Sequence, residues 1–175
     1  MSVYRDVSHA IACAMSIEAL DNTAAQAWQH KYQAGFPEAR PAGLGLSPEE
    51  QKAQHSMTRA ILHKHLSPAE WHALVAWRSI NDREVLDAVR WLVARIESPA
   101  GRLFVTKAVT AWAVPKRLPK DFYVLHSWDA DGRPDGTLRR WRAEINKALN
   151  EKRNAAVKQA GYVLLFWGLL QSECA

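Results

Sequence analysis

Cysteine is scarce in this chain, and its scarcity excludes two classes of site. Cys13 and Cys174 are the only cysteines; they lie near opposite ends of the sequence and form no CxxC pair. A disulfide framework and a cysteine zinc site both need several closely spaced cysteines. Neither is therefore expected, and a reducing cytoplasm is the expected compartment.

Long apolar runs are missing as well. The most apolar run, residues 161–170, is shorter than the roughly twenty residues that a membrane-spanning helix needs. Arg5, Asp6 and His9 interrupt any signal-peptide pattern at the N-terminus. We therefore expect a cytoplasmic protein with no membrane partner, in which 161–170 forms a buried closing helix.

Sequence motifs of common enzymes are absent. The chain contains no GxGxxG, GxxxxGK[ST], GxSxG or HExxH sequence. His63, His65 and His72 are close together, but their spacing does not place all three on one face of a helix, as a metal site would need. A partly exposed helix end explains them better, so no catalytic residue, metal or cofactor is expected.

The signals that are present favour an all-α fold. Two segments, Ser47–Glu50 and Ser67–Glu70, each combine a serine N-cap, a proline at the first helical position and a glutamate three residues after the cap. Ser98-Pro99 repeats the first half of this signal. With the apolar periodicity, these signals predict helices near 48–65, 68–79, 82–97 and 99–113. The only strand-like run, 122–125, is expected to be a short β-like connector.

A further amphipathic helix is predicted over residues 137–160. Thr137 is its expected N-cap, and no glycine or proline follows until Gly161. At about 100° per residue, Leu138, Trp141 and Ile145 share one side, which should face a core. The other side carries a small residue among cations and amides: Arg139, Arg140, Ala143, Lys147 and Asn150, with Arg142 and Asn146 on the shoulders.

Positive charge is concentrated in the same region. Between Arg133 and Lys158 there are eight basic residues and three acidic ones, an excess that equals the formal net charge of +5 of the whole chain. Such an excess on one helix attracts polyanions, and duplex DNA suits a helix of this shape. A solvated basic face is the alternative explanation.

The residue types on this helix suit DNA recognition. A small residue lets a helix approach a groove, arginine reaches guanine or phosphate, and asparagine reads adenine. Cations in the preceding loop are candidate phosphate contacts, although a basic surface loop is often only solvated. The candidate DNA-binding residues are Arg133, Thr137, Arg139, Arg140, Arg142, Asn146, Lys147, Lys116, Arg117 and Lys120.

The chain is also rich in tryptophan, with eight residues of this type. Trp71, Trp91, Trp112 and Trp141 occupy apolar-periodic positions, which predicts a helical core rather than a stacking platform for single-stranded nucleic acid. Trp128 lies in a turn, and we expect it to contact a partner.

Two segments resemble known DNA-binding proteins. Leu66–Leu74 (LSPAEWHAL), followed later by Asp135–Arg140 (DGTLRR), is similar to the helix-turn-helix of region 4 in sigma factors. The same segments resemble the DNA-binding part of phage Q-type transcription antitermination factors, including AlpA-like bacterial members. The resemblance implies an all-α, compact multi-helix domain containing a helix-turn-helix-like DNA-binding element with inserted helices.

The resemblance also implies a function. A Q-type factor binds promoter-proximal double-stranded DNA, loads onto RNA polymerase that still holds its sigma factor, and allows readthrough of terminators. Arg139, Arg140 and Lys147 would then contact DNA, Arg142 a phosphate, and the Trp-rich body or the N-terminal arm would bind polymerase. Residues 1–46 would form an N-terminal helical arm and linker, and 47–175 a helical DNA-binding body with its recognition helix near 137–160.

Two other functions remain open on the sequence. One is a phage or host helix-turn-helix repressor that acts as a dimer. The other is a protein-interaction module that inhibits a host complex by placing its basic helix on an acidic protein. The sequence does not fix the oligomeric state.

Overall fold

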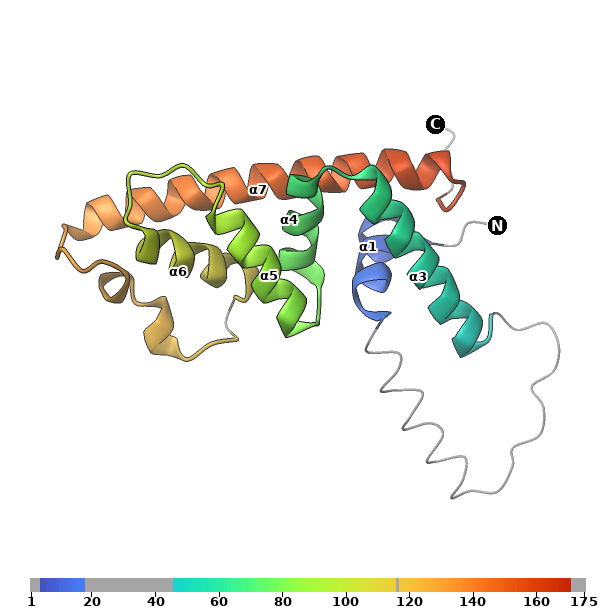
Figure 1. Ribbon diagram of the computed structural model, residues 1–175, viewed down its shortest axis with the longest axis horizontal. Coiled ribbons are helices and arrows are strands. Elements are labelled where there is room, and N and C mark those ends of the chain that lie inside the picture. Colours follow the sequence, from blue (N-terminus) through green and yellow to red (C-terminus); the bar gives the residue numbers. More distant parts are fainter. Residues whose placement is uncertain (1–3, 18–45, 116, 171–175) are drawn as a thin grey trace, which may run out of the picture.

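A single helix of 32 residues, α7 (Asp135–Phe166), forms the spine of the molecule. The computed structural model describes residues 4–17, 46–115 and 117–170. In Figure 1, α7 runs along the full length of this part, and the shorter helices lie beneath it. The described residues form six α-helices and no strands, so the predicted all-α class is confirmed.

The first helices of the body begin where the capping signals place them. α3 (Pro48–His65) and α4 (Pro68–Arg78) each start with a capping box. The Ser47 and Ser67 hydroxyls accept a hydrogen bond from the backbone of a glutamate three residues later, and that glutamate's carboxylate accepts one in return. Because the first N–H groups of a helix have no partner inside it, these bonds fix where each helix begins.

The Ser98-Pro99 signal does not start a helix. α6 (Arg102–Ala113) begins after Gly101, later than predicted. The residue three positions after Ser98 is Gly101, so the glutamate half of the capping box is missing. The Ser98 hydroxyl instead accepts a hydrogen bond of 3.2 Å from the Ala100 N–H, which closes a local turn.

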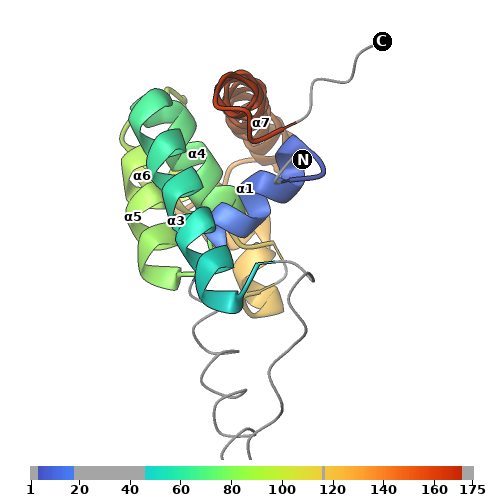
Figure 2. The ribbon, with the colours of Figure 1, turned by 90° about the vertical axis from the view of Figure 1, so that its right-hand side faces the viewer.

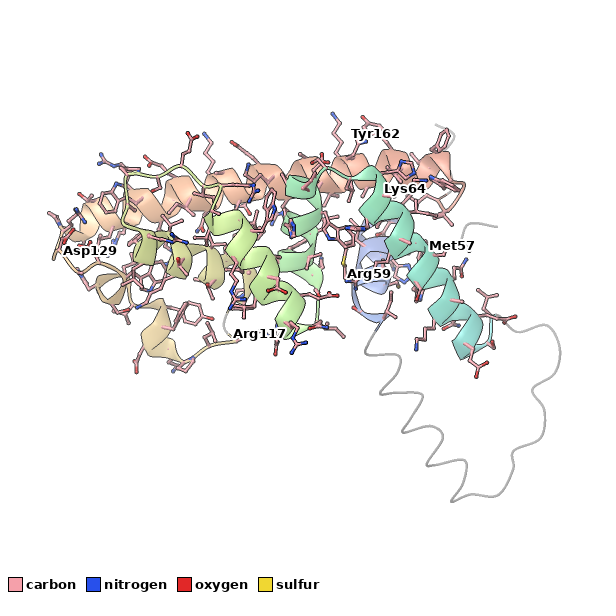
Figure 3. The ribbon with its side chains drawn as sticks, viewed as in Figure 1. Met57, Arg59, Lys64, Arg117, Asp129 and Tyr162 are labelled. Atoms are coloured by element: carbon pink, nitrogen blue, oxygen red, sulfur yellow. The ribbon has the colours of Figure 1, made fainter. Side chains whose placement is uncertain are left out.

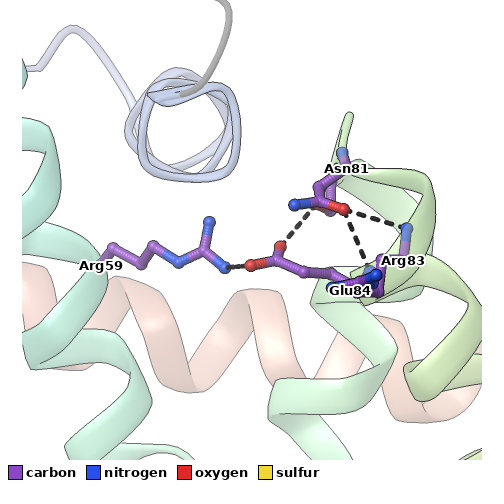
Figure 4. A network of polar contacts seen from close by, with 5 residues as sticks. Arg59, Asn81, Arg83 and Glu84 are labelled. Atoms are coloured by element: carbon purple, nitrogen blue, oxygen red, sulfur yellow. Dashed lines mark hydrogen bonds and ion pairs between the residues drawn. The ribbon is translucent and has the colours of Figure 1, made fainter.

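A polar contact ties α3 to α5 (Asp82–Val93). The Arg59 guanidinium donates to the Glu84 carboxylate at 2.6 Å, and the Ser79 hydroxyl donates to its other oxygen at 2.9 Å. Figure 4 shows this contact beside Asn81, which caps α5. Burial opposes ionisation of Glu84, but the hydrogen bonds from Arg59 and Ser79 outweigh it and hold the Glu84 pKa below its ordinary value.

The run 122–125 lies in short 3-10 helices joined at an extended Val124, so the predicted β-like connector is wrong. These helices are η1 (Lys120–Tyr123) and η2 (Leu125–Trp128). Trp128 is only 1% exposed, and its ring meets that of Phe104 edge to face with centroids 5.4 Å apart. The expectation that Trp128 contacts a partner is therefore wrong, because its ring fills the core.

The predicted inner side of α7 is confirmed. Leu138, Trp141 and Ile145 are 0%, 7% and 2% exposed, and α4, α6 and α1 pack against this helix. Trp71, Trp91 and Trp112 lie half-buried against the same core. The core role predicted for these tryptophans is also confirmed.

The described part of the N-terminal region packs into the body. α1 (Val7–Met15) lies against α3, α4 and α7, and Figure 2, which looks along α7, shows it beside α3. The Tyr4 hydroxyl forms hydrogen bonds with His55 and Thr58 of α3, at 2.8 Å and 2.9 Å. Residues 18–45 of the predicted N-terminal arm and linker lie outside the described residues.

Gly161 does not end α7, contrary to prediction. A Cβ at this position would lie 3.3 Å from a Val7 methyl carbon, so glycine here allows close packing of α1. The helix ends before Gly168, which has a φ of +66°. The expected burial of 161–170 holds only in part, since Phe166 is 85% exposed. None of the described helices combines the length and apolar character needed to cross a bilayer.

Candidate nucleic-acid interface

The start of α7 differs from the prediction. The helix begins at Asp135, with Pro134 in the N-cap position at a φ of −57°, and no side chain caps it. Thr137, the predicted N-cap, is half-buried in the first turn. The Pro134 backbone, with a ψ of 140°, is not yet helical, and the helix starts at the next residue, before the predicted cap.

The outward surface of α7 divides into two strips. The first, which we call the outer ridge, contains four exposed residues about one turn apart: Arg140, Glu144, Lys147 and Glu151. Cations and carboxylates alternate along it at spacings of three and four residues, where side chains on a helix are neighbours. The outer ridge is therefore electrically balanced, as a solvated helix face commonly is.

The second strip follows one side of α7 between the outer ridge and the buried face. This basic flank consists of Arg139, Arg142, Asn146, Asn150 and Arg153. Their spacings of three and four residues keep them near one side of the helix. The carboxylates of α7 beyond its first residue, Glu144 and Glu151, lie on the outer ridge instead. The charge excess of α7 is therefore displayed on the basic flank.

A hollow of about 530 Å³ opens at the N-terminal end of the basic flank. Arg139, Arg142 and Asn146 line it from α7, and Tyr123 and His126 line it from η1 and η2. The exposed, small Ala143 forms part of its wall. The hollow thus combines guanidinium and amide donors with an aromatic ring.

The two arginines of this hollow differ in whether a carboxylate is paired with them. Arg139 forms an ion pair of 2.6 Å with Asp135, whose carboxylate is also 3.6 Å from the His126 ring. Arg142 forms no ion pair with any described residue, and its guanidinium carbon lies over Trp128, 5.5 Å from the ring centroid. Stacking holds a guanidinium by its face and leaves the N–H groups on its edge able to bind an anion.

Two of the predicted cations are engaged by carboxylates away from the basic flank. Arg133 reaches Asp129 at 2.8 Å and Asp131 at 2.7 Å, and so braces the loop before α7. A backbone hydrogen bond from Arg133 is the main cause that lowers the pKa of Asp129. Arg117 pairs with Asp82 of α5 at 2.7 Å, and in Figure 3 it lies well away from α7.

The remaining candidates have no carboxylate partner in the described part of the chain. Lys120 is exposed in η1, and Arg140 and Lys147 are exposed on the outer ridge. Lys116 lies outside the described residues. The structure thus brings Arg139, Arg142 and Asn146 together, and separates them from Arg117 and Arg133.

The sequence prediction missed the C-terminal half of the basic flank. Asn150 accepts a hydrogen bond of 3.0 Å from the Trp112 indole, and the Arg153 guanidinium carbon lies 5.2 Å from the centroid of the Trp77 ring. The signal that would have found Arg153 is the same helical spacing, continued from Arg142 and Asn146.

Comparison of the chain with protein-family models, with curated proteins and with solved structures found no match. The similarity to sigma region 4 and to Q-type factors therefore depends on the two segments quoted above. Within the described ranges, no three His, Cys, Asp or Glu side chains are grouped as a metal site would require.

Proposed function

We propose that the protein binds duplex DNA through the basic flank of α7 and regulates transcription. The observation that carries this proposal is the absence of carboxylates from the basic flank beyond Asp135, on a helix that its neighbouring buried face anchors in the core. Uncompensated cations along one rigid helix produce a positive potential that attracts the phosphate backbone.

The shape of the basic flank also suits a groove. The major groove of B-DNA is about 12 Å wide and admits an α-helix. Ala143 is small enough to let the helix approach, and Asn146 presents an amide of the kind that reads adenine. Arg142, held on Trp128, is placed to bind a phosphate with its free edge.

A more specific form of the proposal includes RNA polymerase as a partner. In it, α4 and α7 form the helix-turn-helix-like element, with α5 and α6 inserted, and the protein acts as an antiterminator loaded onto polymerase and its sigma factor. The resemblance of Leu66–Leu74 and Asp135–Arg140 supports it, as does the packing of α4 on α7. An apolar surface at the end of α7 suits a protein partner: Tyr162, Leu165, Phe166 and Trp167 are all exposed.

Two double variants test DNA binding. Arg142→Ala/Arg153→Ala removes two charges from the basic flank, and Arg140→Ala/Lys147→Ala removes two from the outer ridge of the same helix. We expect the flank variant to lose about 1–3 kcal/mol of duplex affinity for each specific contact, and the ridge variant to lose much less. Fluorescence anisotropy with labelled duplexes measures both, and circular dichroism checks that each variant is folded.

The outcomes separate the proposal from its alternatives. Equal losses in the two variants would indicate non-specific attraction, and absence of duplex binding by the unmodified protein would overturn the proposal. Readthrough of a terminator in a purified transcription system supports the antiterminator. A dimeric mass with a palindromic footprint favours the repressor, and a protein complex that survives nuclease treatment favours the interaction module.

A further inference from the structure

We propose a second phosphate-binding site, centred on Trp77, through which the DNA contact extends from α7 onto α4. This inference rests on the proposed function, because it adds a second site to the protein's proposed DNA-binding surface. Trp77, Arg153, Asn154, Val157 and Lys158 line a hollow of about 490 Å³ there. No carboxylate lines this hollow within the described chain.

Two guanidinium groups share the Trp77 ring. The guanidinium carbon of Arg78 lies 4.0 Å from the ring centroid, and that of Arg153 lies 5.2 Å from it. Neither arginine forms an ion pair with a described residue, although the Arg153 guanidinium donates to the Asn154 amide oxygen at 3.0 Å and 3.2 Å. Because both lie on one ring, the two positive charges are no more than about 9 Å apart and repel each other, so an anion bound near both stabilises the arrangement.

The chemistry of the site selects phosphate over a nucleobase. The Trp77 ring is half-buried and already carries guanidinium groups, so it does not offer an open face on which a base could stack. The Arg78 guanidinium keeps the fork of N–H donors that matches two phosphate oxygens, whereas Arg153 donates to Asn154 from Nε and Nη2 and offers its remaining N–H groups. Lys158 adds a third positive charge to the hollow.

The position of the site fits one major groove of duplex DNA. Arg142 and Arg153 are eleven positions apart in α7, which is about 16 Å along the axis at about 1.5 Å per residue. This separation exceeds the groove width of about 12 Å. The two arginines therefore reach the two phosphate backbones that border one groove, with Ala143 and Asn146 between them. The deep, narrow major groove of an RNA duplex does not admit a helix in this way.

The first test compares Arg78→Ala with Arg83→Ala in the full chain. Both remove one exposed arginine, the first at Trp77 and the second at the start of α5. We expect Arg78→Ala to weaken duplex binding about fivefold on all sequences and to reduce the salt dependence of log Kd by about one. Arg83→Ala should change neither, and Arg78→Lys should keep the salt dependence because it keeps the charge.

The second test observes the Trp77 indole N–H by NMR, with Trp77→Phe used to assign the signal. Titration with a duplex DNA should shift this signal over the concentration range in which the duplex binds. If the duplex binds but Arg78→Ala matches Arg83→Ala and the signal does not move, the Trp77 site is wrong and the proposed function stands. If no DNA duplex binds, and only an RNA duplex or an acidic peptide moves the signal, both proposals fail.

Discussion

The outer ridge and the basic flank run side by side along α7, but their charged side chains have different surroundings. On the outer ridge, exposed cations alternate with carboxylates. On the basic flank, Arg142 and Arg153 are half-buried against Trp128 and Trp77, which come from η2 and α4. The difference shows that neighbouring elements, as well as helical spacing, decide where a charge excess becomes an ordered surface.

The largest expected effect is on protein stability, and it comes from removing a tryptophan ring that lies beneath the basic flank. Trp128→Ala should lower the free energy of unfolding by about 3–5 kcal/mol, because the ring is 1% exposed and its removal leaves a cavity. Trp167→Ala is the matched control; its ring is 48% exposed, and a change within about 0.5 kcal/mol is expected. Urea denaturation measures both, and similar losses would contradict the core role of Trp128.

A smaller effect is expected from adding one carboxylate to α7. Ala143 and Ala155 are both exposed, but Ala143 lines the hollow beside Arg142 and Ala155 lies off the basic flank. Ala143→Glu should weaken duplex binding by about 1–3 kcal/mol, because a new negative charge repels phosphate and competes for Arg142. Ala155→Glu should cost much less. Anisotropy titrations at one salt concentration decide the comparison, and equal losses would argue against a contact at the basic flank.

The smallest expected effect is on stability, and it concerns the contact between Arg59 and Glu84, which lies away from the outer ridge and the basic flank. The Glu84 pKa is lowered in the folded protein, so the stabilisation by its carboxylate is present above the ordinary pKa of 4.5 and is lost as the pH falls through the folded value. Glu84→Gln should therefore reduce stability by no more than about 1 kcal/mol at pH 7, since the ion pair is partly exposed.

The pH dependence of this variant supplies the check. The difference in unfolding free energy between the unmodified protein and Glu84→Gln should shrink as the pH falls below 4.5. Duplex binding at pH 7 should stay unchanged, because Arg59 and Glu84 join α3 to α5 and are not part of the basic flank. A constant difference across this pH range would contradict the contribution of the ionised carboxylate.

Much of the helical framework is predictable because the signals are local. The two complete capping boxes and the apolar side of α7 each depend on residues within a few positions of one another, and all are present in the structure. The signal at Ser98 did not start a helix, because the glutamate that completes a capping box is absent three residues later. The 3-10 helices and the continuation of α7 through Gly161 depend on packing against Phe104 and Val7, which no local pattern reveals.

The candidate site was predictable only in part. The sequence by itself determined that α7 is amphipathic and that the charge excess of the chain lies along it, because spacing and charge are properties of the residues in order. Only the tertiary structure decided which cation is neutralised by a carboxylate from a distant helix, such as Arg117, and which cations lie against aromatic rings, such as Arg142 and Arg153. The partners in these contacts come from other turns and other helices, and their distances are set by packing.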